Sequence, residues 1–468
     1  MSVRLRLFEL TPCLLLACSG IAGPATAEVL RWEGERGSAS IRLSGREIFS
    51  SIWSRSTEDL SQEIARNASD PTCHLAVAFE DCPAFGDLDE EAGWQNLSRL
   101  RVDFSAELHT ALSTRIVYDH ELAGGELDAI GGRLLDTPAT FLGAEWDITW
   151  APRLVWRHAL YRAYVRLEHH PLRVTVGRQR IPWGVGRLWK PIDRFNAIPP
   201  LAIEQDQSPG VDAVEVRWAW GSFAGVQAVY APGDSSGKAR YALRASGVVF
   251  DVDAGAVVGR FEEAFTAGAY VTGNVFQAAY RLEAVWSDPG AETWPIGKPA
   301  PGEPASYWQL VASIDRTFDL GSGLYVLLEQ LYNGNALGFG SGEAGALLAL
   351  FESTPIPPPG LSPADAAALG GPFVRPASPA VAAGSRVVTG ARHLTGVQLS
   401  YEWASSLRAQ TLAIWDWRGR SAAIFPRLTY RGWNAAEVGL GAQVFIGPDE
   451  SEYGLVPDRV FVQLDFFF

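Results

Sequence analysis

A cluster of basic side chains between residues 153 and 194 is the part of this sequence best equipped for chemistry. It comprises Arg153, Arg157, Arg162, Arg166, Arg173, Arg178, Arg180, Arg187, Lys190 and Arg194. Glu168 and Asp193 are the acids of the same stretch, although the chain of 468 residues carries a formal net charge of −14. Guanidinium groups around a passage lower the energetic cost of admitting an anion. The cluster therefore predicts a path for anions, while the acidic total argues against nucleic-acid binding.

The segments that carry these arginines have the pattern of β-strands. Polar and apolar side chains alternate through residues 162–167 and again through 172–176. The same period of two recurs along residues 100–109 and 458–468. Each polar set includes charged side chains, as expected for strands with lipid on one face and water on the other. The alternation predicts a transmembrane β-barrel with the arginines on its inner face.

The segment 458–468 is apolar on one face and ends in Phe468. About ten residues suffice for a tilted strand to cross a bilayer. The segment resembles the terminal strand of bacterial outer-membrane β-barrels, in which a final Phe helps the barrel assembly machinery to recognise its client. An edge strand of a soluble β-protein is the alternative.

The lengths of the connections give the direction of the strands. Outer-membrane barrels have short turns on the periplasmic side and longer loops at the cell surface. With a periplasmic C-terminus, long connections such as 182–209 and 334–392 lie at the surface, and short turns such as Gly273–Asn274 lie opposite. We expect an all-β fold, a transmembrane antiparallel barrel of about 16–18 strands over residues 98–468. A first strand and a polar loop or plug precede it in residues 28–97.

A motif follows the second of the two basic strands. Residues 177–184 read G-R-Q-R-I-P-W-G, residues 189–196 read W-K-P-I-D-R-F-N, and residues 208–213 read S-P-G-V-D-A. These motifs resemble those of proteobacterial porin-like barrels, described loosely as porins or alginate-export-like proteins, as does Y-V-L-L-E-Q-L-Y-N-G-N at 325–335. The resemblance covers about residues 98–333 and the terminal strand. It implies diffusion or facilitated passage of a solute and leaves the solute open.

The connection 182–209 has the composition of an irregular segment, because it contains several prolines. Irregular backbone at membrane depth is tolerated only where protein or water shields it from lipid. We therefore expect this connection to fold inward as a constriction, with a surface loop as the alternative. Its expected constriction residues are Trp183, Trp189, Lys190, Asp193 and Arg194.

The expected pore-lining residues come from the basic strands and the motif that follows them. They are Arg162, Tyr164, Arg166, Arg173, Arg178 and Arg180. Two other roles stay open for the arginines. They form ion pairs with inward carboxylates such as Asp103, Glu107, Glu215 or Glu283, or they contact lipopolysaccharide at the barrel rim.

The amino terminus is typical of an exported protein. Residues 1–27 read as a signal peptide with a basic start, an apolar stretch and an A-x-A cleavage site at 25–27. A lipoprotein-type signal ending at Cys18 is the alternative. After cleavage Cys73 and Cys82 remain, and an oxidising compartment predicts a disulfide between them.

The sequence contains no H-E-x-x-H, and its one G-x-S-x-G match, at residues 233–237, is by itself weak evidence of an enzyme. We therefore expect no enzymatic activity, cofactor or metal. The predicted function is a channel for small hydrophilic solutes in the bacterial outer membrane, with a preference for anions or acidic sugars. A non-conducting barrel for adhesion or surface assembly is the alternative. The expected partners are the solute, outer-membrane lipid, lipopolysaccharide and the assembly machinery.

Overall fold

The structure is a computed structural model. It describes residues 29–34, 37–55, 90–125, 141–151, 154–196, 200, 202–203, 210–233, 239–261, 264–288, 306–334, 389, 391–433, 435–448, 451–454, 456 and 458–467. Several predictions fall outside these residues: the signal peptide, the Cys73–Cys82 disulfide, most of the loop 334–392, Arg153 and Phe468. In the described part of the chain, no helix is long and apolar enough to span a membrane.

The described elements are all β-strands. They are β1 (Leu30–Gly34), β2 (Gly37–Arg55), β3 (Glu90–His109), β4 (Leu112–Gly125), β5 (Glu145–Ala151), β6 (Leu154–His169), β7 (Leu172–Gln179), β8 (Val211–Trp220), β9 (Ala224–Ala231), β10 (Arg240–Val249), β11 (Val252–Phe261), β12 (Ala264–Val275), β13 (Ala278–Asp288), β14 (Tyr307–Phe318), β15 (Leu324–Asn333), β16 (His393–Ala404), β17 (Leu407–Asp416), β18 (Ser421–Tyr430), β19 (Ala436–Ile446) and β20 (Asp458–Phe467).

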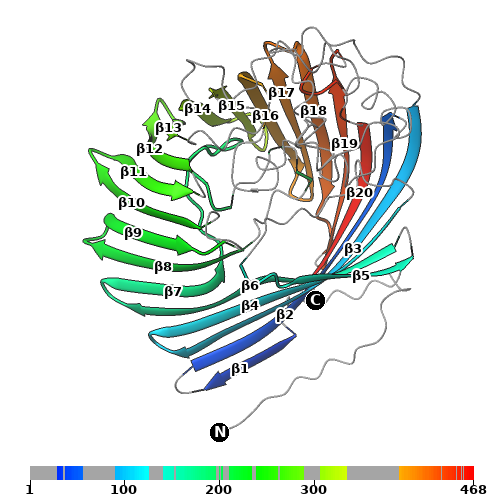
Figure 1. The fold of residues 1–468 in the computed structure, drawn as a ribbon. Helices are drawn as coiled ribbons and strands as arrows, with labels where there is room; N and C mark the ends of the chain where they lie inside the picture. The colour runs from blue at the N-terminus through cyan, green and yellow to red at the C-terminus, as the bar shows by residue number, and fades with distance from the viewer. Residues whose placement is uncertain are drawn as a thin grey trace, which may run out of the picture.

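Eighteen of these strands close into an antiparallel barrel (Figure 1). Sequential strands pair, β4 pairs with β6, and β20 returns to β2 with Ser44 opposite Phe467. The remaining two strands extend existing edges: β1 shares an edge of β2 with β20, and β5 shares an edge of β6 with β7. The predicted antiparallel barrel of about 16–18 strands is confirmed.

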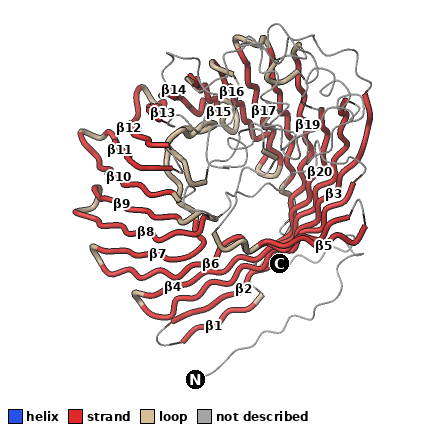
Figure 2. The backbone as a smooth tube through the Cα atoms, viewed as in Figure 1, coloured by secondary structure: helices blue, strands red, loops and turns tan. Residues whose placement is uncertain are grey.

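Short turns gather at one end of the barrel, as Figure 2 shows for the turns of β6–β7, β8–β9 and β10–β11. One predicted turn is misplaced. Strand β12 continues through Gly273 and Asn274 to Val275, and the turn lies at Phe276 and Gln277 with φ of 47° and 67°. Gly273 stays in the strand because the ring of Tyr280, its cross-strand partner, lies over it, and a Cβ there would meet the Tyr280 hydroxyl at 2.8 Å.

The N-terminal region also differs in extent from the expectation. Strand β2 runs to Arg55 and β3 begins at Glu90, so both strands reach into the stretch expected to be a polar loop or plug. Their pairing continues from Ser38 opposite Glu107 to Arg55 opposite Glu90. The wall is therefore longest along this strand pair.

The two faces of the wall have different side chains. Leu282, Leu310 and Leu328 are each more than 40% exposed on the outer face, whereas their sequence neighbours Glu283 and Val311 are buried on the inner face. An exposed apolar belt around a closed ring of strands satisfies the backbone and suits hydrocarbon. The protein is thus a membrane-spanning β-barrel of the outer-membrane type.

Candidate functional site

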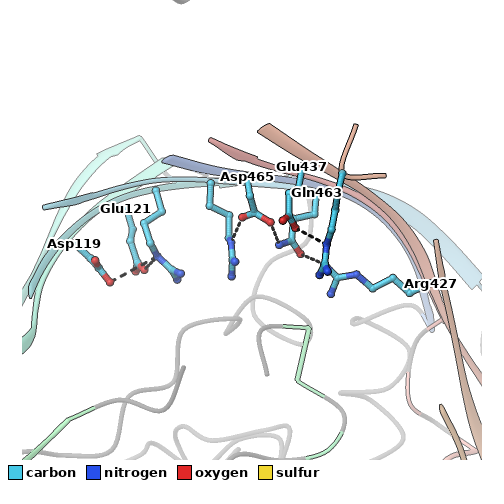
Figure 3. Close-up of polar contacts among 9 residues, drawn as sticks. Asp119, Glu121, Arg427, Glu437, Gln463 and Asp465 are labelled. Atoms are coloured by element: carbon cyan, nitrogen blue, oxygen red, sulfur yellow. Dashed lines mark hydrogen bonds and ion pairs between the residues drawn. The ribbon is translucent and has the colours of Figure 1, made fainter. Parts of the chain in front are cut away.

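The inner face of β2, β3, β4, β6 and β7, with Arg180 directly after β7, carries four of the five predicted pore-lining arginines, and we call it the arginine wall. Its members are Arg46, Arg99, Arg101, Arg115, Arg162, Arg166, Arg173 and Arg180. Carboxylates on neighbouring strands pair with several of them, but the expected acids have other partners: Asp103 pairs with Arg115, and Glu283 accepts hydrogen bonds from backbone N–H groups. Figure 3 shows part of this polar face, with Asp119, Glu121, Gln463 and Asp465 on one side of the strands.

The two partners of an inner-face ion pair can differ in exposure. Arg115 donates two hydrogen bonds to Asp103, at 2.9 and 2.7 Å. The Arg115 side chain is 39% exposed, against 15% for Asp103. Arg187 lies 3.9 Å from Asp315 and is 51% exposed, against 9% for the acid. In both pairs the arginine side chain is more exposed than that of its acidic partner.

The predicted residue Arg162 lies among like charges. Its guanidinium lies 5.5 Å from the centroid of the Tyr161 ring, and the guanidinium of Arg101 lies 4.3 Å from the same centroid. Arg162 also interacts electrostatically with Arg115 and Arg180. The structure therefore brings arginines from β3, β4, β6 and the end of β7 together.

The other predicted lining residues lie along β6 and β7. Arg166 stacks over the ring of Tyr164 at 5.2 Å and donates to Thr175 Oγ1 at 3.3 Å. Arg173 donates to Glu168 at 2.5 Å, in a pair whose members are 34% and 50% exposed. The charge of Arg173 is therefore shared with an accessible carboxylate.

Arg178 and Arg180 are two residues apart but have different surroundings. Arg178 is 1% exposed and donates two hydrogen bonds to Asp212, at 2.9 and 3.0 Å, and one to the Leu160 carbonyl. Arg180 is exposed, and among the described residues it interacts electrostatically with Asp193 and Arg162. The charge of Arg178 is thus compensated by Asp212, whereas the side chain of Arg180 is exposed.

Residues 180–196, which we call the inner segment, lie against the inside of the barrel. Ile181, Trp183, Ile192 and Phe195 are buried in one apolar cluster with inward side chains of β8–β13. Leu188 and Trp189 are buried in a second cluster with side chains of β14–β18. Figure 1 shows this coil inside the ring, next to β12 and β13.

The predicted constriction residues are mostly packed rather than open. Trp183 donates its indole N–H to Gln227 at 2.8 Å, and Trp189 is 3% exposed, so these rings stabilise the segment. Arg194 is 2% exposed and donates to Gln309 at 2.8 Å. Lys190 is half-buried.

Asp193 lies in the inner segment, outside the spanning strands, and is 4% exposed. It accepts backbone hydrogen bonds from Phe195 at 3.3 Å and Asn196 at 2.8 Å. Burial raises the pKa of Asp193 to about 7, although these hydrogen bonds oppose the shift. The carboxyl therefore titrates close to neutral pH.

Two carboxylates have a role that the sequence did not reveal. Glu283 of β13 was expected as a partner for lumen arginines, and Glu329 of β15 was not singled out. Both accept hydrogen bonds from the backbone of the inner segment. The available signal was a charged residue at an inward position within an apolar strand. Within the described residues, no group of His, Cys, Asp and Glu could hold a metal ion.

No protein-family model matches the sequence, and no curated protein matches it. The fold is similar to the crystal structure of OccK7 (OpdD) from Pseudomonas aeruginosa, with 8% identity over 92% of this chain and 99% of that chain and a TM-score of 0.48. It is similar to OccD3 (OpdP) from the same organism, with 11% identity, 95% and 94% coverage and a TM-score of 0.47. It is also similar to a BenF-like porin from Pseudomonas fluorescens Pf-5, with 9% identity over 90% of this chain and 97% of that chain and a TM-score of 0.46. Likenesses at this level imply nothing about activity.

Proposed function

We propose that this barrel is an outer-membrane channel for small hydrophilic solutes and that it favours anions, including acidic sugars. The observation that carries the proposal is the gathering of Arg115, Arg162 and Arg180 on one inner wall. Like charges held together at a wetted surface create a positive potential that attracts anions.

The distribution of inward acids supports the same preference. Glu283 and Glu329 are 3% and 0% exposed and are committed to backbone N–H groups, so their negative charge is covered. Asp103 and Asp315 are less exposed than the arginines beside them. The exposed side chains of the wall are therefore more basic than the full set of its charged residues.

Tyr161 and Tyr164 supply flat surfaces beneath the guanidinium groups. A solute with a planar carboxylate or a sugar ring can stack and form hydrogen bonds along such a surface. This arrangement favours organic anions over simple electrostatic selection of small ions.

Planar-bilayer recording of the folded protein tests the proposal. We expect stepwise conductance and a reversal potential in a salt gradient that indicates anion preference. Replacement of Arg162, Arg166 and Arg173 by Ala should move the reversal potential toward zero or cation preference. Arg31→Ala is a matched control, because Arg31 lies on β1, outside the arginine wall, and bonds Glu33 two positions away.

The absence of stepwise current from correctly folded protein would overturn the channel and favour a non-conducting barrel for adhesion or surface assembly. Cation preference that is the same in the wild type and the triple variant would leave a channel but reject anion guidance.

The proposal also gives the barrel an orientation in the membrane and two partners there. The short turns face the periplasm, and the outward Val460, Val462 and Leu464 of β20 meet the assembly machinery during insertion. Surface ends of the strands contact lipopolysaccharide. Replacement of Val462 and Leu464 by Asp should prevent insertion into the outer membrane of cells, which fractionation measures; normal insertion would contradict the role of β20.

A further inference from the structure

Glu329 binds three consecutive backbone N–H groups of the inner segment. Its Oε2 accepts from Arg187 at 2.7 Å, and its Oε1 accepts from Leu188 at 2.9 Å and Trp189 at 2.7 Å. The side chain is fully buried. Consecutive N–H groups that converge in this way form a concave site suited to an anion. Here the barrel's own carboxylate occupies that site.

Glu283, two strands away, also accepts three backbone hydrogen bonds from the inner segment. Its Oε1 accepts from Val185 and, at 2.6 Å, from Gly186, while Oε2 accepts from Ile192 at 3.2 Å. Strand β14 lies between the strands of the two acids. Six backbone N–H groups of one irregular stretch thus end on two carboxylates that are fixed to the wall.

The sequence of the segment is adapted to this approach. Gly184 has φ of +88°, and a Cβ there would lie 3.1 Å from the Glu283 carboxylate. At Gly186 a Cβ would lie 1.9 Å from the Trp189 carbonyl. Only glycine allows the backbone to turn this tightly over the carboxylates.

Apolar packing alone does not fix such a path. Trp183 and Trp189 anchor the segment at two points, but the backbone between them has no strand to pair with. Buried N–H groups require an acceptor, and an ionised carboxylate accepts more strongly than a neutral group. The two acids therefore determine where the segment lies between its aromatic anchors.

We infer that Glu283 and Glu329 are positioning residues that clamp the inner segment to the wall and thereby set the cross-section open to a solute. The consequence for passage rests on the proposed function. The clamp itself is a property of the fold and can be measured without conductance.

Hydrogen exchange of the refolded barrel tests the clamp. In the wild type, the amides of Gly186, Leu188, Trp189 and Ile192 should exchange slowly. Glu329→Gln keeps the shape but replaces one acceptor oxygen by a donor. We expect amides 187–189 to exchange roughly tenfold to hundredfold faster, the factor that follows from losing a hydrogen bond to a charged group. Glu283→Gln should likewise accelerate exchange of the backbone amides of residues 185, 186 and 192.

Glu437→Gln is the matched control, because Glu437 bonds Arg431 near the short turns. It should leave exchange of the inner segment unchanged. Heat-modified gel mobility shows whether each variant forms a barrel. Should a variant not fold, the wild-type rates still decide: fast exchange of these amides would overturn the clamp. Unchanged exchange in both folded Gln variants would overturn it as well and assign the position to apolar packing.

Single-channel recording then distinguishes the clamp itself from its effect on the cross-section of the channel. A functioning channel whose open-state current becomes noisier or changes level in Glu329→Gln supports control of the cross-section. Altered exchange with unaltered current confines the acids to a structural role and rejects that control. Absence of current in the wild type rejects the proposed function while the exchange result still stands.

Discussion

Arg101 and Asp119 face each other across the β3–β4 pair, where two hydrogen bonds of 2.6 Å join the guanidinium to the carboxylate. Asp119 is 1% exposed. Arg99 lies 3.8 Å from the same carboxylate but bonds Glu121 at 2.5 Å, so Asp119 mainly compensates Arg101. Removing it leaves buried positive charge without its nearest counter-charge.

Asp119→Ala should lower the free energy of unfolding by about 3–5 kcal/mol, the usual cost of removing one partner from a buried ion pair. Tryptophan fluorescence during urea unfolding in lipid vesicles measures this. Asp147→Ala provides the comparison, because Asp147 pairs with Arg157 but its side chain is 42% exposed. Its loss should be below about 1 kcal/mol. Equal losses in the two variants would contradict the distinction.

Arg178 and Arg180 should respond oppositely to truncation. Arg178→Ala leaves Asp212 buried without the guanidinium that compensates its charge, so it should destabilise the barrel by about 3 kcal/mol or more. Arg180→Ala should leave stability unchanged within about 0.5 kcal/mol but reduce anion preference in the reversal potential. Unfolding curves and bilayer recordings of both variants check this. An unchanged reversal potential in Arg180→Ala would show that this charge does not reach the solute.

Gly186→Ala should loosen the inner segment, since the added Cβ would meet backbone at 1.9 Å. Trypsin cleavage after Arg187 should become faster in the folded variant. Gly247→Ala is the control, because its Cβ would make ordinary contact with Ala224 at 3.4 Å. Resistance of Gly186→Ala equal to that of the control would refute the tight turn.

Asp193 should make stability depend on pH. Its pKa is about 7 in the folded protein and near 4 in the unfolded chain, so the folded state holds a proton that the unfolded state has lost. The free energy of unfolding should therefore fall as pH rises from about 4 to about 7 and level off above.

Asp193→Asn keeps the acceptor oxygen and removes the titration. Relative to this variant, the wild type should lose on the order of 2–4 kcal/mol between pH 4.5 and 8, as measured by urea unfolding at both values. Parallel pH profiles for the two proteins would rule out Asp193 as the source.

The barrel was predictable because its period of two and its turn spacing are local properties of the chain. The turn at Phe276–Gln277 was not, since Gly273–Asn274 has the stronger turn composition. What decides the position is Tyr280, whose ring covers Gly273 from the neighbouring strand. A cross-strand contact of this kind is invisible until the register is known.

In the candidate site, too, some features could be predicted from the sequence and others could not. Arginines on alternate positions of β6 and β7 could be read from sequence, and their gathering with Arg101 and Arg115 follows from strand order. The roles of Glu283 and Glu329 could not, because their partners are backbone atoms about 90 to 140 positions away. Arg178 similarly looks like its neighbour Arg180 until Asp212 is placed beside it.

The β2–β20 seam has a consequence for how the barrel forms. Arg46 and Asp465 bond across it although they are 419 positions apart, whereas most other neighbouring strands are joined by short stretches of chain. Contacts between distant parts of a chain form slowly, because the chain loses much freedom before they reward it. Hairpins can assemble one after another, but the ring shuts only when these two strands meet. Closure is thus the slow, long-range step of folding, and until it occurs both seam strands expose unpaired backbone edges that invite aggregation.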